Sequence, residues 1–257
     1  AKERENFGFY FSAHPVAQYR EAASANGART YQSLMEAGAP PGGRGTAVMA
    51  ALVEGIYRAD TTIGLLRQKG NLGIGTFNDL DGELVLLDGK VYCLRPQGDA
   101  EVISDDVHTP FALTTQFEGD TEDRFEKIEE AAFEHALLDL VPSTNLMYAI
   151  RIDGRFDYIR ARSVPKMMNY LPLAEIASLQ TVFEFKDVEG TIVGFYTPNF
   201  LSGVHLPGLH LHFITKDRTR GGHLLAAAPS KASVKLQHAP SVELGLPMTL
   251  DFLTMER

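Results

Sequence analysis

The 257-residue sequence carries a net charge of −9, with 44% hydrophobic and 22% charged residues, which is ordinary for a globular protein. The negative charge argues against a nucleic-acid surface, because phosphate binding requires clustered Lys and Arg. The single cysteine, Cys93, excludes an internal disulfide and a cysteine-rich zinc site. The charged first residues show no leader, and no stretch approaches the ~20 apolar residues of a membrane helix, so we expect a cytoplasmic protein without a membrane partner.

The first part of the chain has a helical pattern. Apolar residues recur at helical spacing over residues 2–37, and the Gly- and Pro-rich stretch GAPPGGRG at 38–45 predicts a linker. A second helix is predicted over 46–67, with a new turn beginning at Thr61-Thr62.

From residue 70 onward the pattern changes to short strands separated by turns. We predict hairpins that turn at Asp88-Gly89, Asp153-Gly154 and Glu189-Gly190, and a charged helix over 121–141. The predicted fold class is therefore α+β, with mixed or antiparallel sheets, a few helices and two lobes. The expected division is an N-terminal helical appendage (1–45), an N-terminal lobe (46–165) and a C-terminal lobe (166–257).

The segment GLHLHFITKDRTRGGHLL (208–225) carries the strongest chemical signal. His210 and His212 are two apart, so on a strand both imidazoles project from one face. A polar stretch ending in Gly-Gly predicts a turn, after which the returning strand brings His223 beside the pair. Three imidazoles from one hairpin are typical of a half-open zinc site, which leaves a position for water or substrate.

A simpler interpretation competes with the metal site. A His-x-His pair on a strand is more often a polar face or a hydrogen-bonded core pair, and only the third histidine makes metal binding an even choice. His205 is separated from the pair by Pro207-Gly208, so we expect it in a loop outside the site. The other histidines have no partner at ligand spacing and are interpreted as structural or exposed: His14, His108, His135 and His238.

Six blocks in the same order resemble the alpha-acetolactate decarboxylase family over about residues 46–257. They are GNLGIGTFNDLDGELVLLDGKVY, VHTPFALTTQF, MYAIRIDGRF, RSVP, VFEFKDVEGTIVGFYTP and the histidine segment. The resemblance implies zinc-dependent conversion of 2-acetolactate to acetoin and CO2 through a metal-stabilised enediolate. It also implies a homodimer, by analogy alone.

The resemblance assigns roles to individual residues. Zinc would be held by His210, His212 and His223, where substrate would chelate it through carbonyl and hydroxyl oxygens. Glu83, in Leu-Asp-Gly-Glu, would take the hydroxyl proton or complete the metal shell, and Arg162 would orient the carboxylate or deliver the proton. Thr76 would line the substrate pocket. Without the resemblance, Glu83 and Arg162 would be interpreted as solvated surface residues.

Two positions depart from the family pattern. The family carries a second glutamate near the metal in a C-terminal helix after the LPMTLDFL region, where this sequence offers only Glu256. After the Pro of RSVP, a basic residue and a glutamine are common, and here Lys166 is followed by Met167. These departures predict reduced activity or a shifted specificity.

The front of the chain resembles a different family. ERENFGFYFSAHPVAQYREAASANGART is similar to a stretch of the bacterial DNA polymerase III alpha subunit, and this resemblance extends over about residues 1–54. The piece carries none of the polymerase's catalytic carboxylates, so we expect a helical appendage without polymerase activity.

Two alternatives stay open from the sequence. Three histidines on a β-rich scaffold also suit a non-haem iron oxygenase or a metal hydrolase. The chain could instead be a folded but non-catalytic binding or scaffold protein.

Overall fold

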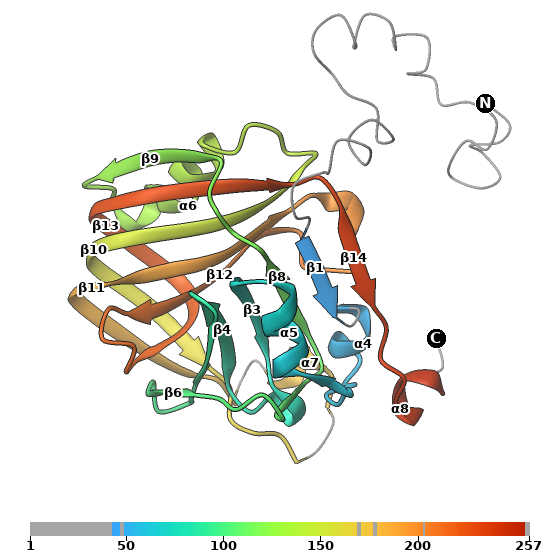
Figure 1. Ribbon diagram of the computed structural model, residues 1–257. Helices are drawn as coiled ribbons and strands as arrows, with labels where there is room; N and C mark the ends of the chain where they lie inside the picture. Colours follow the sequence, from blue (N-terminus) through green and yellow to red (C-terminus); the bar gives the residue numbers. More distant parts are fainter. Residues whose placement is uncertain (1–42, 47–48, 169–170, 177–178, 203, 255–257) are drawn as a thin grey trace, which may run out of the picture. The chain divides into compact units, whose positions relative to one another are not determined.

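The computed structural model describes residues 43–46, 49–168, 171–176, 179–202 and 204–254. These residues lie in one compact unit that begins at Pro41, so nearly all of the expected helical appendage lies outside them. Two large β-sheets, a separate two-stranded sheet and short helices make up the unit (Figure 1), which confirms the predicted α+β class. None of the helices in the described ranges is long and apolar enough to cross a membrane.

The first sheet has seven strands. All of its pairs are antiparallel except the parallel pair of β1 with β14. Its strands, in spatial order, are β14 (Val242–Gly245), β1 (Gly43–Thr46), β8 (Ala112–Thr115), β3 (Leu72–Thr76), β4 (Glu83–Leu87), β5 (Lys90–Leu94) and β6 (Ala100–Val102).

The second sheet has five strands, three of them long. In spatial order they are β10 (Met147–Ser163), β11 (Thr181–Thr197), β12 (Gly208–Thr215), β13 (Gly221–Ala239) and β9 (Thr121–Glu126). Because β13 also pairs with β10, four of these strands close into a ring. Both sheets draw strands from either side of residue 165, since β9 and β10 precede it and β14 follows it. The lobe boundary at that residue stays a prediction.

Two predicted hairpins are single continuous strands. The predicted turn at Asp153-Gly154 lies inside β10, and that at Glu189-Gly190 lies inside β11. Gly154 pairs with Gly190, and a Cβ on Gly154 would come within 2.3 Å of the Lys231 carbonyl oxygen. These glycines therefore serve close strand packing rather than a turn. The hairpin at Asp88-Gly89 is confirmed, because both residues have positive φ.

The helix predictions were partly wrong. The region predicted as one helix over 46–67 holds α4 (Met49–Val53), the short β2 (Thr61–Thr62) and α5 (Ile63–Lys69). The predicted new turn is confirmed, because the Thr62 side chain caps α5 by accepting from the Leu65 N–H. Of the stretch 121–141, the first residues form β9, and the helix is confined to α6 (Glu130–Asp139). The predicted linker at 38–45 includes the start of β1.

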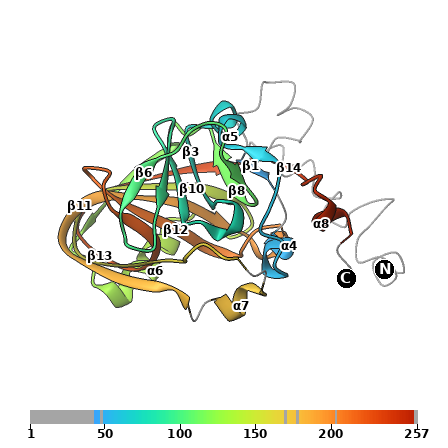
Figure 2. The ribbon, with the colours of Figure 1, turned by 90° about the horizontal axis from the view of Figure 1, so that it is seen from below.

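Helices α5 and α6 pack on opposite sides of the two large sheets. Figure 2 shows α5 on one side of the layered arrangement and α6 on the other. Leu66 of α5 packs with Leu84 and Leu86 of β4, whereas Phe133 and Leu137 of α6 pack on the five-stranded sheet. The inner faces share a separate core. Burial of both inner faces, worth roughly 25 cal/mol per Å² of apolar surface, fixes the strands that carry the predicted site residues. Short additional elements are β7 (His108–Thr109), which pairs with β2, α7 (Leu173–Ile176) and α8 (Leu250–Leu253).

Candidate metal centre

The three predicted ligand histidines converge between the two sheets. His212 of β12 is in register with His223 of β13, and their ring centroids are 5.2 Å apart. The His210 ring lies 5.2 Å from that of His212 and 5.0 Å from that of His223. One nitrogen from each ring lies within 4.8 Å of the others. The alternation of the strand and the turn after it therefore produce the predicted cluster.

Glycines allow the strands to approach closely enough to build this cluster. A Cβ on Gly221 would lie 2.3 Å from the Phe213 carbonyl oxygen, and one on Gly222 would lie 2.7 Å from the Arg162 carbonyl oxygen. Distances under 3 Å are not tolerated against backbone atoms, so a larger residue would push β13 away from its neighbours. The Gly-Gly pair before His223 thus places that imidazole beside its partners.

The cluster is buried at His210 and His212 and partly exposed at His223. His212 is fully buried, His210 is 8% exposed, and His223 is half-buried. Burial lowers the pKa of His212 to about 3, because desolvation penalises the imidazolium, and it also lowers those of His210 and His223. All three rings are therefore neutral near pH 7, which is the form that binds a metal.

Each of the three rings carries a buried nitrogen without a hydrogen-bond partner among the described residues. They are Nδ1 of His210, Nε2 of His212 and Nδ1 of His223. The Leu84 carbonyl oxygen lies 2.9 Å from Nδ1 of His212. Because a carbonyl only accepts, it fixes the tautomer that leaves Nε2 free. Orphaned buried nitrogens are costly, and a borderline-soft divalent cation such as Zn²⁺ satisfies three at once. The donor set therefore fits a metal ion.

A glutamate and an arginine adjoin the histidines. Arg162 of β10 is in register with His223, and its Nη1 donates to Oε1 of Glu83 on β4 over 2.8 Å. The other carboxylate oxygen of Glu83 lies 3.5 Å from Nε2 of His212. Since His212 is neutral, that contact is no ion pair. The structure thus brings all five of these predicted residues together.

The environment of Glu83 opposes its ionisation. The side chain is 8% exposed, and desolvation raises its pKa, while the charge and hydrogen bond of Arg162 act in the opposite direction. Arg162 is more accessible, with 24% of its side chain exposed. The pair therefore combines a buried carboxyl group with a partly exposed guanidinium.

The remaining predicted residues occupy different positions. Thr76 is buried opposite Glu83 in the β3–β4 pair, but its hydroxyl donates to the Gly82 carbonyl oxygen at 2.8 Å. Met167, at the family's glutamine position, is buried in an apolar cluster near α4 and α7. Lys166 points its ammonium to Asp79, 3.6 Å away. Glu256 lies outside the described residues.

His205, expected in a loop outside the site, lies between η4 (Asn199–Leu201) and β12 and outside the group of three ligand histidines, but its ring is next to them. It is 3% exposed, and its ring centroid lies 5.3 Å from that of His210. Burial lowers its pKa to about 4, against a raising contribution from the Leu206 carbonyl. The sequence signal was its position five residues before His210, but the intervening Pro207-Gly208 left open whether the chain brings His205 back to the other histidines.

Of the other histidines expected to be structural or exposed, His238 pairs with Asp120 over 3.0 Å and His135 is 83% exposed in its side chain.

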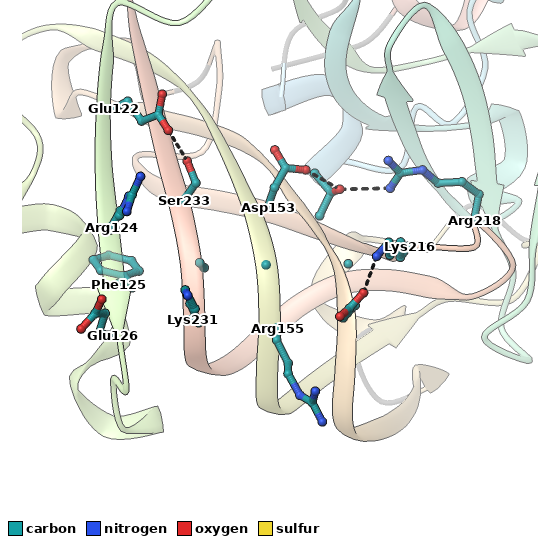
Figure 3. A pocket seen from close by; sticks show the side chains of 15 residues that line it. Glu122, Arg124, Phe125, Glu126, Asp153, Arg155, Lys216, Arg218, Lys231 and Ser233 are labelled. Atoms are coloured by element: carbon teal, nitrogen blue, oxygen red, sulfur yellow. Dashed lines mark hydrogen bonds and ion pairs between the residues drawn. The ribbon is translucent and has the colours of Figure 1, made fainter.

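A recess lies elsewhere on the five-stranded sheet. It measures about 760 Å³ and crosses β9, β13, β10 and β11 (Figure 3). It shares no residue with the histidine cluster. Much of its polar lining is already paired: Asp153 accepts from Thr191 over 2.8 Å, and Ser233 donates to Glu122 over 3.1 Å. Its charged groups provide no comparable set of orphaned donors or acceptors, so the histidine cluster is the stronger candidate site.

The family model and the similar curated proteins point to the same family. The family model described as alpha-acetolactate decarboxylase matches residues 45–256. A protein of that name from Methanosarcina mazei is 43% identical over 80% of this chain and 72% of its own length. Its Bacillus subtilis namesake is 38% identical over 79% of this chain and 81% of its own.

Solved structures agree with the sequence matches. The crystal structure of alpha-acetolactate decarboxylase from Bacillus subtilis strain 168 superimposes with a TM-score of 0.80 at 36% identity, covering 83% of this chain and 92% of that one. A Staphylococcus aureus protein of unknown function, described as similar to that enzyme, also gives 0.80, at 28% identity, covering 83% of this chain and 93% of that one. With the family model matched over most of its length, this chain belongs to the alpha-acetolactate decarboxylase family of carboxy-lyases.

Proposed function

We propose that this chain catalyses the zinc-dependent decarboxylation of 2-acetolactate to acetoin and CO2. The proposal rests mainly on three neutral imidazoles beside the Glu83–Arg162 pair. Each imidazole has a buried nitrogen without a partner among the described residues. The relatives' shared name supports the substrate, and the all-histidine donor set supports zinc. We also expect a homodimer located in the cytoplasm. Sedimentation of the purified protein would test the oligomeric state.

The reaction requires stabilisation of developing negative charge. When the carboxylate of a β-keto acid leaves as CO2, its bonding electrons move toward the ketone oxygen. A divalent cation held by the three histidines supplies positive charge for that electron density. The buried walls exclude water on the His212 side, which strengthens electrostatic interactions there.

Arg162 orients the substrate. Its guanidinium lies in the same cross-strand row as His223 and is partly accessible, so it can bind an incoming carboxylate. The hydrogen bond to Glu83 fixes its direction. The alternative role is delivery of the proton to the product carbon, for which the same partly accessible guanidinium would hold the donor.

Glu83 handles the hydroxyl proton. Its raised pKa makes it a stronger base than an exposed carboxylate once ionised, and the neighbouring Arg162 keeps the ionised form accessible. Its second oxygen faces His212 at 3.5 Å, so it lies beside the donor set rather than in bulk solvent. A carboxyl group in this position can accept a proton from a substrate hydroxyl and return it later.

The test is acetoin formation from racemic acetolactate by the purified protein, with CO2 and O2 followed in parallel. We expect acetoin and CO2 in equal amounts without O2 consumption. O2 consumption would favour an oxygenase, and hydrolysis of esters or amides without CO2 release would favour a metal hydrolase. Bound zinc without acetoin formation would favour a non-catalytic protein.

A further inference from the structure

Four imidazole nitrogens in one contiguous cluster lack partners within the described part of the chain. Three belong to the proposed metal ligands, and the fourth is Nε2 of His205. The His205 ring neighbours only one of the three, His210, at 5.3 Å, and it is not part of the group whose nitrogens lie within 4.8 Å of one another. The metal therefore explains the first three nitrogens and leaves the fourth unexplained.

The other nitrogen of this ring is firmly held. Nδ1 of His205 lies 2.9 Å from Oγ1 of Thr197 and 3.1 Å from the Leu206 carbonyl oxygen. A carbonyl oxygen can only accept, so the contact with Leu206 is a hydrogen bond only when Nδ1 carries the proton, and in that tautomer the Thr197 hydroxyl oxygen accepts from the same N–H. Nε2 is then a lone-pair acceptor in a ring whose orientation is fixed. The main-chain N–H of His205 also donates to the Leu201 carbonyl oxygen at 3.1 Å, which holds the segment in place.

Neither packing nor a structural water explains the orphaned nitrogen. The ring packs 5.4 Å from Phe111, a contact that phenylalanine at position 205 would make without burying a polar atom. A small cavity of about 10 Å³ adjoins the ring, at the lower limit for one water. Its other lining residues are apolar, among them Leu113 and Leu201, so a water there would find too few polar partners. A ligand bound on the His210 side would bring the missing donor.

We propose that His205 is a further substrate-contacting residue, whose Nε2 accepts a hydrogen bond from the hydroxyl of a hydroxyketone bound beside His210. The contact is made before Glu83 takes that proton and again after Glu83 has returned it. This inference rests on the proposed function, because it takes the substrate class from there. A hydroxyl is the one donor that 2-acetolactate and acetoin share. The contact gives the site a means of orienting the hydroxyl-bearing carbon, independent of the carboxylate contact made by Arg162.

The test measures acetoin binding as well as turnover. The full chain is loaded with Co²⁺, which accepts the same ligands as zinc, and acetoin is titrated while the visible spectrum is recorded. His205→Phe keeps the ring and removes the acceptor, and His205→Gln restores an acceptor oxygen. His135→Phe on α6 is the matched control, since that side chain is 83% exposed.

We expect His205→Phe to retain one metal ion per chain and to bind acetoin about tenfold more weakly, the loss of one neutral hydrogen bond. His205→Gln should recover part of that loss, and His135→Phe should match the original chain. In the assay, the KM for acetolactate should rise in His205→Phe by more than kcat falls.

An unchanged acetoin Kd in His205→Phe would overturn the inference, as would loss of its metal, which would show that the ring serves the ligands instead. If His205→Phe does not fold, Thr197→Val removes one tether and carries the same test, with an unchanged Kd again overturning the inference. No spectral response of the original chain to acetoin also overturns it. Turnover separates the two proposals: a chain that makes no acetoin refutes the function, whereas turnover with an unchanged Kd refutes only the role of His205.

Discussion

Arg162 donates to Glu83 across the gap between the two sheets, with Nη1 and Oε1 2.8 Å apart. The arginine lies on β10 of the five-stranded sheet, and the glutamate begins β4 of the seven-stranded sheet. A second bond joins the same strand regions, because Ser163 Oγ donates to the Leu94 carbonyl oxygen over 2.9 Å. The relative placement of the two sheets therefore sets the distance between the three histidines of the five-stranded sheet and the Glu83 carboxyl group of the seven-stranded sheet.

Glu83→Gln should abolish most activity without releasing the metal. Glutamine keeps the shape and can still accept from Arg162, but it cannot take up a proton, so we expect kcat to fall by about 10²–10⁴-fold. Steady-state kinetics and metal analysis of the same sample check this. Glu122→Gln, at an exposed position on β9, serves as the control. Unchanged turnover in Glu83→Gln would remove this residue from the mechanism.

His223→Ala should weaken zinc binding by at least about 100-fold. It removes one of three protein ligands, and the two remaining imidazoles cannot hold the ion alone. Competition with a chromogenic chelator measures the affinity. His238→Ala is the control, since that ring pairs with Asp120 and lies outside the cluster. Equal zinc affinity in the two variants would show that His223 is not a ligand.

The metal-free protein should lose stability as the pH falls below about 6.5. The folded-state pKa of His212 is about 3, whereas an unfolded histidine titrates near 6.5. The unfolded chain therefore takes up a proton that the folded chain refuses, so the stabilisation is complete above pH 6.5 and declines toward pH 3. By pH 5 the loss from this residue is about 2 kcal/mol.

Urea unfolding in the presence of a chelator, at pH 7.5 and pH 5, measures this loss. His212→Asn should reduce the difference between the two pH values by about the same 2 kcal/mol. A variant with the same pH dependence as the original chain would show that His212 is not kept neutral by burial.

Gly154→Ala should destabilise the fold by at least about 1–3 kcal/mol, because the added Cβ would overlap the backbone of β13. Thermal unfolding measures the effect. Gly64→Ala is the comparison: it lies in α5, where alanine is favoured, and its Cβ would lie 3.1 Å from the Asp105 Cβ and 3.3 Å from its carbonyl oxygen, a milder contact than the 2.3 Å at Gly154, so it should lose less stability. Equal melting temperatures would imply that Gly154 stands at a turn, as the sequence pattern had indicated.

The parts that the sequence predicted well depend on local rules. The His-x-His alternation and the Gly-Gly return place three imidazoles together because strand periodicity is two and the connection is short. The Asp88-Gly89 turn is likewise local, since both residues adopt positive φ.

The parts that were missed depend on contacts between distant segments. The sequence around Gly154 and Gly190 does not show whether each glycine forms a turn or lets a neighbouring strand approach closely. The atoms that a Cβ would meet belong to β13 and β12, which are distant in the sequence. His205 was missed for a similar reason. Its tether is Thr197, at the end of β11, so its return to the cluster follows from the pairing of β11 with β12 rather than from local spacing.

The central claim is that a cation held by the three histidines accepts electron density from a departing carboxylate. The most direct measurement is acetoin formation by one preparation before chelation, after chelation and after return of one equivalent of zinc. We expect activity to disappear with the metal and to return with it. Full activity in protein shown to be free of divalent metal would contradict the account.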